Sequence, residues 1–175
     1  MRCRLLTLII VGVFVPAGVQ AQSVTLKATV SETVSISVPP NSIDADVVNM
    51  GNTVRLTLSS IDSPVVRVPL LVRSNTGFKI AATFESKTAV LTQLSVDDAK
   101  ATGGLASPQV VNALDLKSYD DPNTSQPLLV LTGPRVSLGG TLQSPNNALQ
   151  ITVLIRLKDP AKVGPVHLTF NAQPL

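Results

Sequence analysis

Apolar and polar residues alternate along most of this chain, and a period of two is typical of β-strands that bury one face. The clearest stripes run from Leu149 to Leu157 and from Val166 to Ala172. Further stripes occupy residues 54–58, 66–72, 78–84, 110–116, 127–132 and 135–138, and turn-forming stretches such as "SNTG" and "KDPAKVGP" separate them. No segment of useful length repeats every 3.6 residues, as a helix would. The pattern therefore predicts an all-β, antiparallel fold.

Two sheets packed face to face would bury every stripe. We therefore expect a β-sandwich of about 8–10 strands in one domain, with a closed barrel as the alternative. Pro69 falls inside a stripe and has no N–H to donate, so it is expected at a sheet edge or a bulge. The stretch from Asp97 to Gln126 is the least regular part of the chain. We expect it to form a long, solvated excursion.

The first stripe, from Ser23 to Pro40, is too long for one strand. Extended over about fifteen residues it would span about 50 Å, whereas strands usually have about 3–10 residues. Glu32 interrupts it, and a lone carboxylate is costly to bury. We therefore expect a bend at residues 31–33, after which Val34 to Val38 form a separate strand. The part before the bend is a candidate strand-addition arm, paired either within its own sheet or with a neighbour; its apolar residues are Val24, Leu26, Ala28 and Val30.

The first 21 residues resemble a secretory signal peptide. Arg2 and Arg4 precede an apolar run of about 11 residues, and Ala21 ends a stretch of small residues suited to cleavage. A membrane-spanning helix needs about 20 residues, so no membrane span is expected after cleavage. The mature domain would comprise residues 22–175 and be secreted, periplasmic or held at the cell surface.

The composition excludes several classes of function. Two of the 14 basic residues lie in the leader, so the mature chain would carry a formal charge of +1. Without a basic run, nucleic-acid binding is not expected. Cys3, the single cysteine, also lies in the leader. The mature domain is therefore expected to depend on packing, without disulfides.

Catalytic and metal-binding motifs are missing from the sequence. His167 is the single histidine and falls on the polar face of the last stripe, so we interpret it as an exposed strand residue in a protein that is not an enzyme. No cofactor is expected. Calcium at the acidic turns is the alternative, although none has the spacing of a specific calcium loop; these turns are Asp97 with Asp98, Asp44 with Asp46, and Asp120 with Asp121 and Asn123.

One loop offers a candidate ligand-binding region. The phenylalanines of the mature chain lie on apolar stripes and are expected in the core. Tyr119, within the excursion, is the aromatic residue expected to be exposed as a binding contact, and a tyrosine that packs its own loop is the favoured alternative. The candidate loop-binding residues are Tyr119, Asp120, Asp121 and Asn123.

The order of the segments "VTLKATVSETVSISVP", "VVNMGNT", "VPLLVRSNTGFKI" and "ITVLIRLKDPAKVGPVHLTF" resembles that of bacterial exported surface and fimbrial proteins, a set that includes chaperone-usher pilins and spore-coat-U-like subunits. The resemblance implies an Ig-like sandwich and assembly by an N-terminal strand that completes the sheet of the next subunit. A structural or adhesive surface protein is therefore the first functional hypothesis. A periplasmic or secreted module that binds a ligand or a partner protein is the alternative.

Overall fold

The computed structural model describes residues 31–59, 63–87, 89–101, 113–122, 126–136, 148–158 and 165–175. The chain divides into two units, Met1–Val30 and Ser31–Leu175, and every described residue belongs to the second. This part contains no helix that is long and apolar enough to cross a membrane. Its strands are β1 (Val34–Ser37), β2 (Asp46–Met50), β3 (Thr53–Leu58), β4 (Val65–Ser74), β5 (Phe78–Ser86), β6 (Val90–Ala101), β7 (Asp115–Leu116), β8 (Ser118–Asp120), β9 (Leu128–Gly133), β10 (Leu149–Lys158) and β11 (Val166–Pro174).

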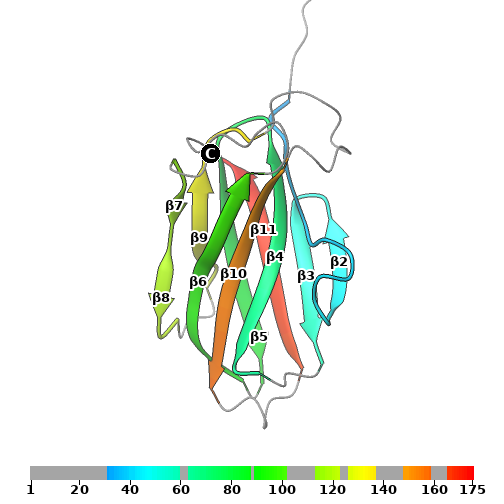
Figure 1. Ribbon diagram of the computed structural model, residues 1–175, viewed down its shortest axis with the longest axis vertical. Helices are drawn as coiled ribbons and strands as arrows, with labels where there is room; N and C mark the ends of the chain where they lie inside the picture. Colours follow the sequence, from blue (N-terminus) through cyan, green and yellow to red (C-terminus); the bar gives the residue numbers. More distant parts are fainter. Residues whose placement is uncertain are drawn as a thin grey trace, which may run out of the picture. The chain divides into compact units, whose positions relative to one another are not determined.

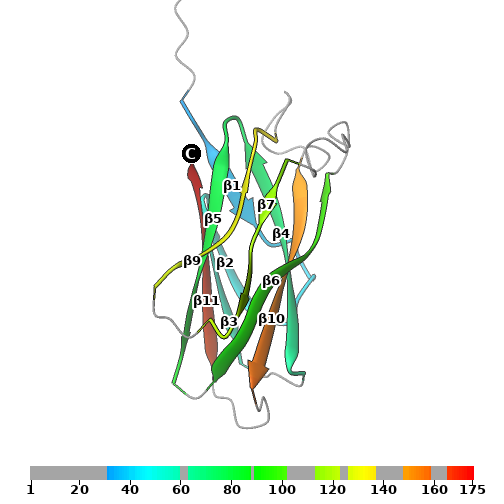
Figure 2. The same ribbon diagram turned by 90° about the vertical axis from the view of Figure 1, so that its left-hand side faces the viewer.

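The strands form two antiparallel sheets. Sheet A has the order β1-β4-β10-β6-β8, and sheet B has the order β2-β3-β11-β5-β9-β7. Figure 1 looks onto sheet A with sheet B behind it, and Figure 2 shows the two layers from the side. The predicted all-β, antiparallel sandwich is confirmed. The eleven strands exceed the expected number because β7 and β8 form within the stretch that was expected to be irregular.

Successive strands in the described chain nearly always change sheets. β2 and β3 share a sheet and are joined by the turn at Gly51 and Asn52, whereas every other step in the strand order passes to the opposite sheet. Neighbours within a sheet are therefore far apart in sequence. β11, for example, lies between β3 and β5. This topology brings together side chains that no local pattern connects.

The alternation buries one face of each long strand between the sheets. Phe78 and Phe170 are completely buried, and the buried residues of both sheets form one hydrophobic cluster. No cysteine lies among the described residues, so this core and the strand ladders hold the sheets together.

The first stripe resumes as β1 after Glu32. Val34, Ile36 and Val38 are buried, whereas Glu32 is exposed. β1 pairs with β4, beginning with Val34 opposite Ser74. The separate strand expected after residues 31–33 is present, and the carboxylate stays out of the core because it has no partner there.

Pro69 lies where sheet A has an open edge. β1 pairs with β4 only as far as Leu71, so residues 65–70 of β4 have a ladder partner in β10 alone. Odd-numbered residues at this strand direct their backbone groups toward β1, as the Asn75 N–H does in donating to Thr33. Even-numbered residues direct theirs toward β10, as the Pro64 carbonyl does in accepting from Leu157. The N–H that Pro69 lacks would therefore point to the open side of β4. The hydrogen bonds between β4 and β10 are not affected by its absence. Of the two expected positions, an edge or a bulge, Pro69 takes the edge.

The turn between β2 and β3 joins the two sheets at one side of the sandwich. The Gly51 carbonyl accepts from the Ile36 N–H of β1 at 2.9 Å, and the Asn52 carbonyl accepts from the Ala172 N–H of β11 at 2.8 Å. Gly51 has a φ of 71°, as the first central residue of a type II′ turn requires. At the opposite side, β7 pairs with sheet B and β8 with sheet A, so residues 115–120 bridge the layers.

Candidate functional site

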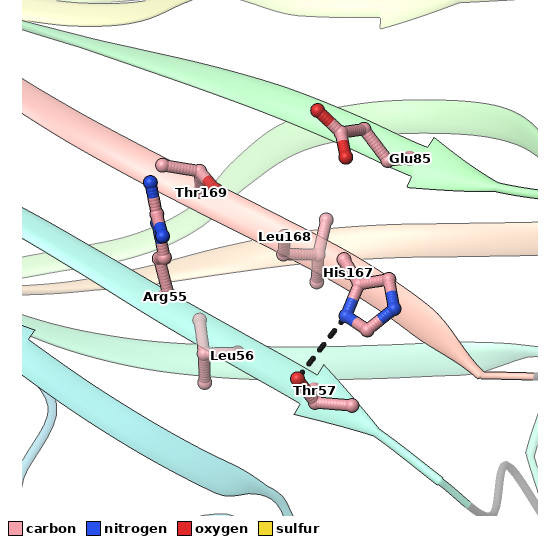
Figure 3. A pocket seen from close by; sticks show the side chains of 7 residues that line it. All are labelled: Arg55, Leu56, Thr57, Glu85, His167, Leu168 and Thr169. Carbon is pink, nitrogen blue, oxygen red and sulfur yellow. Dashed lines mark hydrogen bonds between the residues drawn. The ribbon is translucent and has the colours of Figure 1, made fainter.

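A shallow hollow of about 270 Å³ lies on the outer face of sheet B. Figure 3 shows Arg55 beside Thr169 at one end and His167 beside Thr57 at the other, with Glu85 on the neighbouring strand. The hollow is lined by Arg55, Leu56 and Thr57 of β3, Glu85 of β5, and His167, Leu168 and Thr169 of β11. The two leucines are core residues, so the polar groups come from the other five.

Strand register aligns the polar side chains in two rows. His167 lies opposite Thr57 on one side and Glu85 on the other, while Thr169 lies opposite Arg55 and Thr83. Residues directly opposite on one sheet face have Cβ atoms about 4.5–5.5 Å apart. Because β11 is paired on both sides, the backbone ladders set these spacings.

The hollow presents donors and acceptors that the described residues leave unused. A hydrogen bond of 3.1 Å joins Thr57 Oγ1 and His167 Nδ1. Within the described residues, the side chains of Arg55, Glu85 and Thr169 have no hydrogen-bond or ion-pair partner. The guanidinium offers N–H donors, the carboxylate offers acceptors, and the hydroxyl does both. This set suits a ligand with several neighbouring hydroxyl groups.

The predicted loop-binding residues do not gather at this hollow. Tyr119 lies in β8, half-buried against the core, and its hydroxyl donates to the Leu129 carbonyl at 2.7 Å. Tyr119 is therefore not an exposed binding contact; the alternative of a packing tyrosine agrees with the structure, in which the ring packs β8 onto the sandwich. Asp120 and Asp121 are exposed, and Asp121 has the positive φ of a turn residue, 59°. Asn123 lies outside the described residues.

The acidic pair Asp97 and Asp98 lies within β6, which runs on to Ala101 instead of ending before the predicted excursion. Asp97 accepts from Arg67 Nε at 2.8 Å, and Asp98 pairs with Lys100 Nζ at 2.8 Å. The hydrogen bond from Lys100 lowers the pKa of the Asp98 carboxyl, and the same bond raises the pKa of Lys100. Both ion pairs are exposed, and exposed pairs add little stability.

The other acidic positions considered for calcium lie around β2. Asp44 precedes the strand, and Asp46 is its first residue. In the described part of the chain, no group of three or more His, Cys, Asp or Glu residues is placed to hold a metal ion.

Asn75 fixes the backbone just before β1. Its Oδ1 accepts from the Thr33 N–H at 2.7 Å, and its Nδ2 donates to the Ser31 carbonyl at 2.8 Å. The Asn75 N–H also donates to the Thr33 carbonyl at 3.2 Å, so backbone and side chain together end the pairing where β4 stops and the chain turns into β5. β4 has no residue left to pair with the segment before Ser31. The candidate arm, Val24, Leu26, Ala28 and Val30, lies outside the described residues.

Sequence reasoning placed His167 on a polar strand face but did not find its neighbours. Arg55, Thr57, Glu85 and Thr169 also occupy polar positions of stripes, so the alternation identified the face to which each belongs. The missing information was that β11 inserts between β3 and β5. Thr57 and His167, which share a hydrogen bond, are 110 positions apart.

Comparisons with known proteins assign no family. No family model matches the chain, and no curated protein matches it. Among solved structures, a family 29 carbohydrate-binding module described in complex with mannohexaose is similar with a TM-score of 0.29 and 7% identity, covering 83% of this chain and 94% of that one. At this level of similarity the match assigns neither a family nor a ligand.

Proposed function

We propose that this protein is an exported, non-catalytic module that binds a saccharide on the outer face of sheet B. The supporting observation is the hollow itself, where polar side chains from three paired strands converge and Arg55, Glu85 and Thr169 have no partner within the described residues. Neighbouring sugar hydroxyls both donate and accept, so they complement a guanidinium, a carboxylate and a threonine hydroxyl placed side by side. Export rests on the leader expected for residues 1–21.

Binding explains this arrangement better than catalysis does. A threonine nucleophile activated by histidine needs an acid that orients the imidazole through its second nitrogen. His167 bonds to Thr57 through Nδ1, but within the described residues no hydrogen bond joins it to Glu85. The hollow is also shallow, so it would not exclude water from a reacting group.

Arg55→Ala is expected to weaken saccharide binding at least tenfold, because it removes the fork of donors from the hollow. Affinity electrophoresis of the exported protein through gels containing mannan, xylan, dextran or laminarin identifies the ligand, and calorimetry with its oligosaccharides measures the change. Arg156→Ala is the matched control, since Arg156 is an exposed arginine on the outer face of sheet A. The proposal fails if no polysaccharide retards the protein, or if both variants bind equally well.

A structural surface role through strand addition is the second candidate. It is favoured by the end of the β1–β4 ladder, because the Asn75 side chain, and not a further residue of β4, bonds to Ser31 and Thr33. An arm that continues upstream in extended form would need an edge other than β4. Its alternating Val24, Leu26, Ala28 and Val30 would suit the edge of another subunit.

Leu26→Lys is expected to abolish assembly if the arm adds to a neighbour, because the charge would enter an apolar pocket. Thr25→Lys, on the alternate face of the arm, is expected to leave assembly intact. Light scattering of the exported protein and of both variants measures the mass in solution. Unchanged mass in both variants, together with a loss of thermal stability in Leu26→Lys alone, would mean that the arm belongs to its own sheet.

A further inference from the structure

The outer edge of β2 is open to pairing. β2 ends sheet B and pairs with β3 alone. In a two-residue hairpin the flanking residues, here Met50 and Thr53, exchange backbone hydrogen bonds. The alternation of an antiparallel ladder then directs the N–H and C=O groups of Val47 and Asn49 away from β3. No other backbone group among the described residues bonds to them.

Two of the three residues on the outer face of this edge strand are apolar, and the third is the exposed Asp46 at its start. Val48 is 53% exposed and Met50 is 44% exposed, and they share a face because they are two residues apart. The strand contains neither lysine nor proline, which often protect an open edge from pairing, and its one charged residue is Asp46 at its start. β2 therefore combines free backbone groups with an apolar surface at Val48 and Met50.

Several other edges in the described residues carry charged residues or are short. The unpaired half of β4 carries Arg67 and Pro69, and Pro69 lacks the outward N–H. Beyond its pairing with β8, β6 carries Asp98 and Lys100. β7 and β8 have two and three residues, and β1 donates its Ile36 N–H to the β2–β3 turn. Of these edges, β2 is the one suited to accept a strand.

We propose that β2 pairs antiparallel with β2 of a second copy of this chain, about a two-fold axis at Val48. The pairing places Val47 opposite the partner's Asn49, so both outward sets of backbone groups are satisfied. It places Val48 opposite the partner's Val48, which joins the exposed valines and methionines of both copies in one apolar cluster. Asp46 lies opposite the partner's Met50, so no like charges face each other. A second copy of β2 fits this edge because the pairing satisfies the outward backbone groups, joins apolar side chains and opposes no like charges.

This dimer would have a functional consequence. A two-fold axis perpendicular to the sheet turns both outer faces to the same side. The hollows around His167 would then lie five strand spacings apart, about 24 Å. Two sites on one face bind a repeated surface ligand with higher avidity than one site does. This consequence rests on the proposed saccharide function, whereas the pairing of β2 does not.

The test compares two valines of equal exposure. Val48→Lys is expected to convert the exported protein from dimer to monomer in sedimentation velocity, while Val90→Lys is expected to remain dimeric. Val90 lies in β6 and is 51% exposed, against 53% for Val48. Val48→Cys is expected to form an intermolecular disulfide under mild oxidation, because directly opposed residues outside the hydrogen-bonded pairs approach closely. Val90→Cys is the control, and the mature chain has no cysteine to confuse the result.

A monomeric wild-type protein at every concentration would overturn the proposal. So would a disulfide that forms no faster in Val48→Cys than in Val90→Cys, or a dimer that Leu26→Lys dissociates and Val48→Lys does not. These measurements use no ligand. A dimer without saccharide binding therefore supports the pairing and counts only against the proposed function.

Discussion

Replacing Phe170 by alanine is expected to lower the free energy of unfolding by about 3–5 kcal/mol. Phe170 is completely buried on β11, with Val54 and Ala82 opposite it on the two flanking strands. Its ring fills the core beneath three paired strands, and a cavity left there cannot collapse without moving them. The loss would therefore include both the transfer of the ring and the cost of the void.

Urea denaturation of Phe170→Ala and of the wild-type protein measures this loss. Thr169→Ala, the next residue on the outer face of the same strand, is the matched control and is expected to cost about 0.5 kcal/mol or less. If Phe170→Ala does not fold, Phe170→Leu is expected to show a smaller loss in the same direction. Equal stability of the Phe170 and Thr169 variants would contradict the assignment of inner and outer faces on β11.

Gly133→Ala is expected to destabilise the protein by about 1–3 kcal/mol through overpacking. An added Cβ would lie 2.5 Å from Leu114 Cδ2 and 2.7 Å from Phe78 Cε1 and Cζ. Gly133 lies opposite Phe78 in the β5–β9 ladder, so its missing side chain makes room for the ring and for Leu114. The substitution would force the ring or the backbone before β7 to move.

Gly77→Ala provides the comparison, because its Cβ would meet the exposed Leu175 side chain at 3.2 Å. That side chain can rotate away, so little change in stability is expected. Thermal unfolding of both variants measures the difference. A Gly133→Ala protein as stable as Gly77→Ala would show that Phe78 is not packed as described.

The functional proposals depend on the outer face of sheet B. Saccharide binding uses the polar positions of β3, β11 and β5, and the proposed dimer uses the apolar positions of β2. Val48 lies directly opposite Arg55 in the β2–β3 ladder, so the dimer contact adjoins the hollow. The two tests remain independent because one measures a ligand and the other measures mass.

The extent of β6 could not be predicted from the sequence because bulges change its period. The register of β6 with β10 shifts twice, and the pairing skips Thr92 and Asp97. Each unpaired residue reverses which positions face the core, so the apolar residues stop alternating regularly. The sequence therefore predicts no stripe over residues 90–96 and an excursion from Asp97, whereas one strand runs from Val90 to Ala101.

The surroundings of Tyr119 could not be predicted from the sequence either. Its place between charged and turn-forming residues indicated an exposed loop. The carbonyl of Leu129 and the edge of β6 hold it against the core, and neither contact has a local sequence signal.

The sequence alone determined the all-β class, the inner and outer faces of β4, β5, β10 and β11, the restriction of Pro69 to an edge or a bulge, and the strand that follows Glu32. These are local properties. The alternation decides which face of a strand is buried, and a missing N–H excludes a ladder position, whichever strand lies beside it. The tertiary structure decided the order of strands, the bulges in β6, the neighbours of His167 and the open edge of β2. These features depend on pairing between distant segments. Backbone hydrogen bonds are alike for most residues, so they do not select a partner strand. The packing of the whole core decides which strands pair.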